Sequence, residues 1–282
     1  MAVIATGFFD GVHLGHRHII ETLVRCAKES DEPAIVLTFW PHPRMVLQNG
    51  ARQLRLLSSL EEKNCRLRAL GVDRIEILEF SKEFAAMTAE EYLKEVVGKN
   101  FCGSTLVLGY DNRLGSDQLT PDKSVELATA MGIRTVVCDP VGQISSTRIR
   151  SALAEGNIAA ANEWLGYEYS IRGAVVSGKQ LGRTIGFPTA NMQLFDPLRM
   201  VPGRGAYLTK VRTLGKELYG MTNVGDVIET HIFDFDEDVY GLDIDVTFVD
   251  FLRHEMNFSS VEELKNQLAI DEISAKNRIF GI

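Results

Sequence analysis

A glycine-rich turn between a predicted strand and a predicted helix most constrains the fold of this chain. Residues 2–5 are apolar, residues 7–16 read Gly-Phe-Phe-Asp-Gly-Val-His-Leu-Gly-His, and residues 19–24 have the pattern of a helix. Glycines let the backbone approach a ligand, and a helix N-terminus offers free N–H donors and a positive dipole end. Because His13 and His16 can add donors, the turn predicts a phosphate-binding site.

The first half of the chain is expected to alternate strands and helices. The expected strands are residues 34–39, 74–78, 104–108 and 134–138, and the expected helices are residues 58–70, 88–97, 122–131 and 146–154. This rhythm predicts a Rossmann-like α/β domain, a parallel sheet with helices on both faces. Ligands of such sheets bind beyond the carboxyl ends of the strands. The glycine-rich turn, the Trp-Pro-His-Pro turn and the turn after Leu108 all fall there.

The second half has a different rhythm, with short strands separated by glycines. The expected strands are residues 171–177, 206–212, 218–224, 229–234 and 242–251, and only residues 261–277 are helical. This pattern predicts a small β-barrel with a terminal helix. We expect two domains, residues 1–166 and 167–282.

Composition excludes several classes of protein. A net charge of −8 argues against a general nucleic-acid binder, which usually carries a basic face. The four cysteines are widely spaced, which suits reduced thiols better than a disulfide or zinc framework. No apolar run approaches the roughly 20 residues of a membrane helix, and no signal peptide precedes the first strand. We therefore expect a cytoplasmic protein with no membrane partner.

A second anion site is predicted where residues 144–150 read Ile-Ser-Ser-Thr-Arg-Ile-Arg. An ordinary capped helix explains the hydroxyls alone. It does not explain Arg148 and Arg150 in the first turns, where the helix dipole favours acids. An anion bound at this helix start explains both features.

A long string in the second half also predicts phosphate binding. Residues 178–191 read Gly-Lys-Gln-Leu-Gly-Arg-Thr-Ile-Gly-Phe-Pro-Thr-Ala-Asn. A P-loop is excluded, because Gln180 replaces the metal-binding hydroxyl and the required helix cannot follow. The glycines and Lys179 can wrap a phosphate chain. Thr189 and Asn191 alternate on an extended segment, so both oxygens face one side and suit Mg²⁺.

These strings resemble those of one family. The turn at residues 7–16 resembles the Gly-x-Phe-Asp-Gly-x-His-x-Gly-His motif of nucleotidyltransferases, in the form seen in bacterial bifunctional riboflavin kinase/FMN adenylyltransferases. Residues 144–150 resemble that family's Ile-Ser-Ser-Thr-x-Ile-Arg motif, and residues 178–191 resemble the riboflavin kinase signature. The resemblance covers nearly the whole chain. It implies that the C-terminal domain makes FMN and ADP from riboflavin and ATP. It also implies that the N-terminal domain makes FAD and pyrophosphate from FMN and ATP, each with Mg²⁺.

The resemblance implies roles for residues of the first domain. It implies catalysis by His13, His16 and Arg148. It implies a flavin-nucleotide site at His42, Pro43 and Asp111. The implied ATP-binding residues are Gly7, Phe8, Phe9, Asp10, Gly11, Gly15, Ser145, Ser146, Thr147 and Arg150. The FMN phosphate is already anionic, so this reaction needs alignment and charge stabilisation rather than a general base.

The resemblance also implies roles in the second domain. Because the ribityl hydroxyl is neutral, it benefits from a general base, and Glu229 matches the family's catalytic glutamate. Arg253 is implied at the flavin, and Thr189 and Asn191 are implied metal ligands. The implied nucleotide-binding residues are Gly178, Lys179, Gly182, Arg183, Gly186 and Pro188.

Some interpretations stay open at this level. The first domain could adenylylate another phosphorylated acceptor, or the second could be a non-catalytic flavin or nucleotide sensor. Two departures bear on this choice. Asn112 and Leu114 stand where aromatics are common, and only residues 225–228 precede Glu229 where relatives carry a longer loop. The oligomeric state is open, with a monomer favoured.

Overall fold

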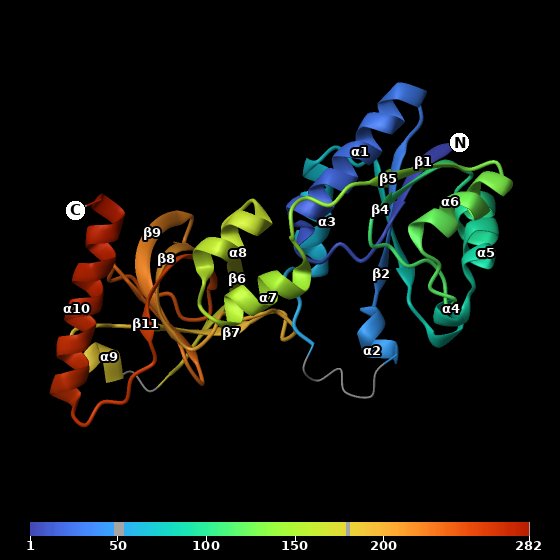
Figure 1. The fold of residues 1–282 in the computed structure, drawn as a ribbon. Coiled ribbons are helices and arrows are strands. Elements are labelled where there is room, and N and C mark those ends of the chain that lie inside the picture. Colours follow the sequence, from blue (N-terminus) through green and yellow to red (C-terminus); the bar gives the residue numbers. More distant parts are fainter. Residues whose placement is uncertain (48–53, 179–180, 282) are drawn as a thin grey trace. The chain divides into compact units, whose positions relative to one another are not determined.

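The computed structural model describes residues 1–47, 54–178 and 181–281 of the chain. Its contacts divide it into two compact units, Met1–Ser146 and Thr147–Ile282 (Figure 1). This division falls earlier than the boundary expected near residue 166, which stays a prediction. Helices α7 (Ser146–Ala154) and α8 (Ile158–Leu165) lie between the two positions, and α8 contacts the barrel strand β11 (Asp243–His254).

The first unit is built on a five-stranded parallel sheet, as expected. Its strands are β1 (Ala2–Thr6), β2 (Ala34–Trp40), β3 (Arg74–Glu79), β4 (Gly103–Gly109) and β5 (Arg134–Cys138). They lie in the order β3-β2-β1-β4-β5, and every pairing is parallel. The chain builds the sheet outward from β1 in one direction and then resumes at β4 in the other. The crevice between the carboxyl ends of β1 and β4 is therefore a topological switch point, where open α/β sheets bind ligands.

Helices cover both faces of this sheet (Figure 1). The helices of this unit are α1 (Leu14–Ser30), α2 (Pro43–Leu47), α3 (Leu60–Ala69), α4 (Lys82–Ala86), α5 (Ala89–Glu91), the π-helical η3 (Tyr92–Asn100) and α6 (Pro121–Ala130). The short helices α2 and α4 were not expected from the sequence. The helix expected over residues 88–97 is present, but most of it has the wider π-helical winding.

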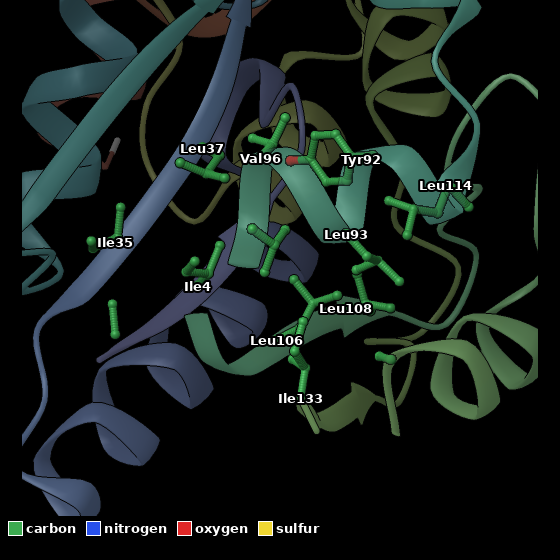
Figure 2. Close-up of a cluster of buried hydrophobic side chains, with 14 residues drawn as sticks. Ile4, Ile35, Leu37, Tyr92, Leu93, Val96, Leu106, Leu108, Leu114 and Ile133 are labelled. Atoms are coloured by element: carbon green, nitrogen blue, oxygen red, sulfur yellow. The ribbon is translucent and has the colours of Figure 1, made fainter. Parts of the chain in front are cut away.

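One face of the sheet packs against η3. Figure 2 shows Tyr92, Leu93 and Val96 turned toward strand side chains such as Ile4 and Leu106. The cluster is fully buried at its centre, and the hydroxyl of Tyr92 lies 2.7 Å from that of Thr6. Leu114 also packs into this cluster, so its aliphatic side chain fills a core position.

The second unit is a closed barrel with a terminal helix, as expected. Its strands, in spatial order, are β10 (Ile228–Ile232), β7 (Ala190–Leu194), β6 (Ser170–Val176), β11, β8 (Gly205–Thr213) and β9 (Lys216–Val224). Two further helices are α9 (Leu181–Thr184) and α10 (Val261–Phe280). The barrel interior holds Tyr169, Tyr207 and Phe248, all fully buried. It also holds a chain of hydrogen-bonded hydroxyls from Thr209, Thr222 and Thr230.

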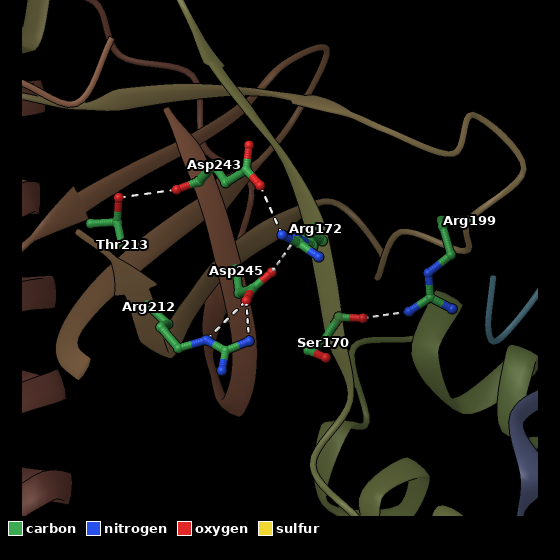
Figure 3. A network of polar contacts seen from close by, with 7 residues as sticks. All are labelled: Ser170, Arg172, Arg199, Arg212, Thr213, Asp243 and Asp245. Carbon is green, nitrogen blue, oxygen red and sulfur yellow. Dashed lines mark hydrogen bonds and ion pairs between the residues drawn. The ribbon is translucent and has the colours of Figure 1, made fainter. Parts of the chain in front are cut away.

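Ion pairs tie three barrel strands together on the outside. Asp245 of β11 lies directly opposite Arg172 of β6 on one side and Arg212 of β8 on the other. Figure 3 shows both guanidinium groups reaching this carboxylate, and Arg172 also contacts Asp243. Opposite charges at directly paired positions help to specify strand register, at modest energy because these arginines are exposed.

Candidate active sites

The glycine-rich turn joins β1 to α1 through a tight 3₁₀ segment, η1 (Asp10–Val12). Phe9, Gly11 and Val12 have positive φ angles of 53°, 78° and 42°. A positive φ suits glycine but strains a β-branched residue such as Val12. Backbone strain of this kind clusters at functional sites, where the surrounding contacts maintain it.

Two glycines of the turn lie directly beneath aromatic rings. A Cβ on Gly7 would lie 3.0 Å from the ring of Phe9, and a Cβ on Gly15 would lie 3.2 Å from the ring of His13. These contacts are tighter than an ordinary van der Waals approach. Gly15 is also near the carbonyl oxygen of Ile144, so the segment before α7 lies against the turn.

The two histidines of the turn form a stacked pair. Their ring centroids are 3.6 Å apart, and Nδ1 of His13 accepts the backbone N–H of His16 at 3.3 Å. A neutral His13 ring therefore carries its proton on Nε2, available to donate. Burial, with smaller effects from His13 and Lys63, lowers the pKa of His16 well below its usual value. His16 is neutral at pH 7, and within the described part of the chain its enclosed Nδ1 has no hydrogen-bond partner.

The carboxylate of Asp10 links the turn to residues 57–58 by hydrogen bonds. It is buried and accepts the backbone N–H groups of Leu57 and Ser58 at 2.9 and 3.2 Å. The Ser58 hydroxyl accepts the N–H of Gly11 at 3.1 Å. On the other side, the Ser146 hydroxyl donates to the backbone oxygen of Asp10 at 3.1 Å. The two predicted phosphate-binding segments, the turn and residues 144–146, therefore meet within the first unit.

The predicted flavin-nucleotide residues stand at the carboxyl ends of neighbouring strands. His42 follows β2, and its ring meets that of Phe8 edge-on at 4.2 Å. Pro43 begins α2, a position that proline favours. Asp111 follows β4 and is exposed. Since β1 lies between β2 and β4, these residues border the turn at the switch point.

The remaining predicted residues of the second anion site belong to α7. Thr147 and Arg148 are exposed, and the guanidinium of Arg148 lies 4.4 Å from the ring of Trp164. Arg150 is half-buried and lies two residues further along the helix. Stacking on Trp164 restrains Arg148, which lowers the entropy that it would lose on holding an anion.

A first barrel pocket, of about 240 Å³, gathers four predicted residues. Gly182, Thr189, Glu229 and Arg253 all line it. The Arg253 guanidinium forms an ion pair with the buried Asp271 of α10 at 2.8 Å, and Gln267 also donates to that carboxylate. Arg253 thereby links the pocket wall to the terminal helix.

Strand register places the predicted base beside a predicted metal ligand. Glu229 of β10 lies directly opposite Asn191 of β7 and Asn223 of β9. Directly paired residues of antiparallel strands point to the same face, with Cβ atoms about 5 Å apart. The three side chains form a row on one face of the barrel wall. The loop of residues 225–227 is a tight hairpin, in which the N–H of Gly225 bonds to the carbonyl of Val227 at 3.1 Å.

A second barrel pocket, of about 330 Å³, contains predicted nucleotide-binding residues. Arg183, Pro188 and Thr189 line it, together with the acidic residues at positions 236–238. Thr189 therefore lines both barrel pockets. Lys179 lies outside the described residues.

Two glycines of residues 178–191 lie too close to neighbouring atoms to carry a side chain. A Cβ on Gly178 would lie 2.2 Å from the Asn191 amide, and a Cβ on Gly182 would lie 2.2 Å from the backbone oxygen of Phe187. Gly186 has a φ of +89°. Gly178 and Gly182 therefore leave no room for a side chain, and the positive φ of Gly186 favours glycine.

Three residues near the sites were missed by the sequence analysis. Asn223 and His231 line the smaller barrel pocket, and Lys63 is buried beneath the glycine-rich turn. Strand periodicity could have revealed His231, which shares a face with Glu229 two residues earlier. Lys63 stands one helical turn before the buried Leu67, so its position on the apolar face of α3 was a readable signal.

Within residues 1–47, 54–178 and 181–281, no helix is long and apolar enough to cross a membrane. The same residues contain no group of three or more His, Cys, Asp or Glu side chains placed to hold a metal ion.

Comparisons with known proteins match both halves of the chain. Residues 1–153 match the FAD synthetase family model, and residues 165–279 match the riboflavin kinase model. Curated bifunctional riboflavin kinase/FMN adenylyltransferases are similar throughout. The Listeria monocytogenes protein is 35% identical over 96% of this chain and 90% of its own. The Escherichia coli protein is 35% identical over 99% of this chain and 93% of its own. The Bacillus subtilis protein is 33% identical over 97% of this chain and 91% of its own.

One solved structure has the same fold over almost its whole length. It is a Streptococcus pneumoniae crystal structure described as a macrolide-efflux protein, with a TM-score of 0.90 and 32% identity over 98% of this chain and 94% of its own. The matches to both domain models favour the bifunctional interpretation over a single activity. Since the chain also aligns nearly end to end with two-domain relatives, it belongs to the family of bifunctional riboflavin kinase/FMN adenylyltransferases.

Proposed function

We propose that this enzyme, a riboflavin kinase and FMN adenylyltransferase, carries out its two reactions at the two sites described above. Adenylyl transfer occurs at the glycine-rich turn, and riboflavin phosphorylation occurs at the barrel pockets. The row of Asn191, Glu229 and Asn223 beside a pocket is the observation that carries the kinase assignment.

At the turn, an oxygen of the FMN phosphate attacks the α-phosphorus of ATP. A P–O bond to FMN forms as the bond to the β-phosphate bridge breaks, and pyrophosphate leaves. No proton must be removed, so the site acts by alignment and charge stabilisation. Nε2 of His13 and the first N–H groups of α1 donate to phosphate oxygens.

At the barrel, Glu229 accepts the proton of the ribityl 5′-hydroxyl as its oxygen attacks the γ-phosphorus of ATP. ADP is the leaving group. Thr189 lines both barrel pockets, so the smaller pocket holds riboflavin and the larger one the nucleotide. Arg253, held by Asp271, shapes the flavin side of the wall.

Mg²⁺ fits the donors at the barrel site. A Thr hydroxyl and an Asn amide are hard oxygen ligands, and Mg²⁺ commonly combines one or two such ligands with phosphate oxygens and water. Thr189 and Asn191 stand two residues apart beside Glu229 and would hold the ion against the ATP phosphates. When bound, Mg²⁺ neutralises charge on the phosphates.

Product analysis tests the assignment directly. The protein is incubated with riboflavin, ATP and Mg²⁺, and the flavins are separated by chromatography. FMN and FAD together support both sites. FMN without FAD contradicts an active first unit. If neither product forms, a parallel incubation with FMN and ATP separates a dead kinase from a wholly inactive chain.

We further propose that the enzyme is a cytoplasmic monomer, with riboflavin, FMN, FAD, ATP, ADP and pyrophosphate as its partners and no nucleic acid. The net charge of −8 supports the lack of a nucleic-acid partner, and the widely spaced cysteines support a cytoplasmic location. Light scattering on the purified protein tests the monomer, and a mass of twice 31.4 kDa would exclude it.

A further inference from the structure

Lys63 is a buried lysine beneath the glycine-rich turn. It projects from α3 and is only 2% exposed. Lysine is almost never fully buried unless its charge is paired, because removing an ammonium ion from water is costly. Packing alone does not explain a lysine at this buried position, because an apolar side chain would fill the space without that cost.

Its ammonium group is held by two oxygen atoms. Nζ donates to the backbone oxygen of Phe8 at 3.0 Å and to the hydroxyl of Thr38 at 2.9 Å. The Thr38 hydroxyl donates to the same Phe8 oxygen at 3.2 Å. Nζ also lies 4.2 Å from the centre of the Phe8 ring, a cation–π contact. Lys63 therefore fixes both the backbone and the ring of Phe8, whose ring in turn contacts His42.

The charged groups around Lys63 belong to the same turn. Asp10 faces it from η1 and favours its charged form, while His16 faces it from α1 and is kept neutral partly by its charge. Two backbone N–H groups already bind the Asp10 carboxylate. The ammonium thus lies beside a turn whose predicted ligand is a phosphate anion. Burial lowers the pKa of Lys63 to about 8, so the charge is lost within an accessible pH range.

We propose that Lys63 is a positioning residue of adenylyl transfer, which holds Phe8 in place and adds positive charge beneath the phosphate-binding turn. It acts on the substrate through Phe8 and through its field, not through direct contact. The inference rests on the proposed placement of adenylyl transfer at this turn.

The test compares Lys63→Met and Lys63→Arg with the wild type. FAD formation from FMN and ATP is measured from about pH 7 to about pH 10, a range that contains the lowered pKa and approaches the ordinary one. At pH 7, Lys63→Met should lower kcat/KM for FMN about tenfold or more. Wild-type kcat/KM should fall at alkaline pH as Lys63 loses its charge, and this alkaline fall should be absent from Lys63→Met. Lys63→Arg, which stays charged, should restore part of the activity and move the fall to higher pH.

Two internal controls show whether the effect is local. Riboflavin phosphorylation by the same variants should stay within about twofold of wild type, because it belongs to the other unit. The exposed Lys123→Met should leave both reactions unchanged. Melting curves check folding, because Lys63→Met removes the positive charge that faces the buried Asp10 carboxylate, and removing one partner of a buried charge pair is destabilising.

Two outcomes overturn the proposal. One is a Lys63→Met enzyme that forms FAD at the wild-type rate across the pH range. The other is an Arg variant with the same alkaline fall as the wild type, which decides the question even if the Met variant does not fold. A His13→Ala variant tests separately whether adenylyl transfer takes place at the glycine-rich turn. If it retains FAD formation, the turn is not the site, whereas loss there with an unaffected Lys63→Met contradicts the role of Lys63 alone.

Discussion

The stacked histidines show how a neighbouring backbone group fixes the tautomer of a side chain. The backbone N–H of His16 occupies Nδ1 of His13 and so directs the remaining proton of the His13 ring to Nε2. Replacing His13 with Ala should lower the rate of FAD formation from FMN by tenfold or more, the usual loss for one charge-stabilising group. A chromatographic assay of FAD measures this. Riboflavin phosphorylation serves as the control, and an unchanged rate of FAD formation would contradict the role.

Burial of His16 makes stability depend on pH on the acid side. Its folded-state pKa lies below the unfolded value of 6.5, so below that pH the unfolded chain binds a proton that the folded chain does not. Its contribution to the free energy of unfolding is therefore present above pH 6.5 and lost as pH falls, by at most about 1.4 kcal/mol per pH unit. Urea titrations should show a shallower acid loss for His16→Gln. The exposed His254→Gln should keep the wild-type slope.

At the barrel, Glu229 should be needed for one reaction only. Glu229→Gln keeps the shape of the side chain but removes the base, so riboflavin phosphorylation should fall by a hundredfold or more. The adenylylation of added FMN should persist at the wild-type rate. Measuring FMN and FAD in separate assays distinguishes this result from a general loss of folding, in which both activities would fall.

At the scale of elements, helix starts are where the sequence is most readable. Ser59 and Thr88 form capping boxes with Glu62 and Glu91, three residues later in each case. Capping boxes are local, since the donor and acceptor groups lie within four residues. In contrast, the spacing of Asn191 and Glu229 along the chain carries no sign of their pairing, because that register depends on the barrel as a whole.

Removing one of these caps should destabilise the first unit modestly. In Ser59→Ala the N–H of Glu62 loses its acceptor, and the expected cost is about 1 kcal/mol in the free energy of unfolding. Chemical denaturation monitored by circular dichroism measures it. Ser177→Ala, an exposed position outside any helix start, provides the comparison and should change stability little. If both variants lose the same free energy of unfolding, the loss in Ser59→Ala is not due to the missing cap.

At the scale of the whole molecule, two chemistries occupy two compact units of one chain. If FMN passes between the sites through solution, two defective enzymes should complement each other. A mixture of His13→Ala and Glu229→Gln, supplied with riboflavin and ATP, should form FAD although neither variant alone does so efficiently. No FAD from the mixture, with FAD still formed by Glu229→Gln from added FMN, would contradict free passage.

The local sequence pattern was sufficient to predict much of the fold of this protein. Hydrophobic periodicity and turn residues were sufficient to predict the fold classes of the two units and the glycine-rich turn, because these patterns are carried by residues close together in the chain. Only the tertiary structure brought Asn191, Glu229 and Asn223 into one row, and only it buried Lys63 under Phe8. The physical reason is that strand register and the depth of burial are set by packing between distant segments. A lysine on an exposed helix face and a lysine beneath the glycine-rich turn have the same residue type, and their surroundings alone separate them.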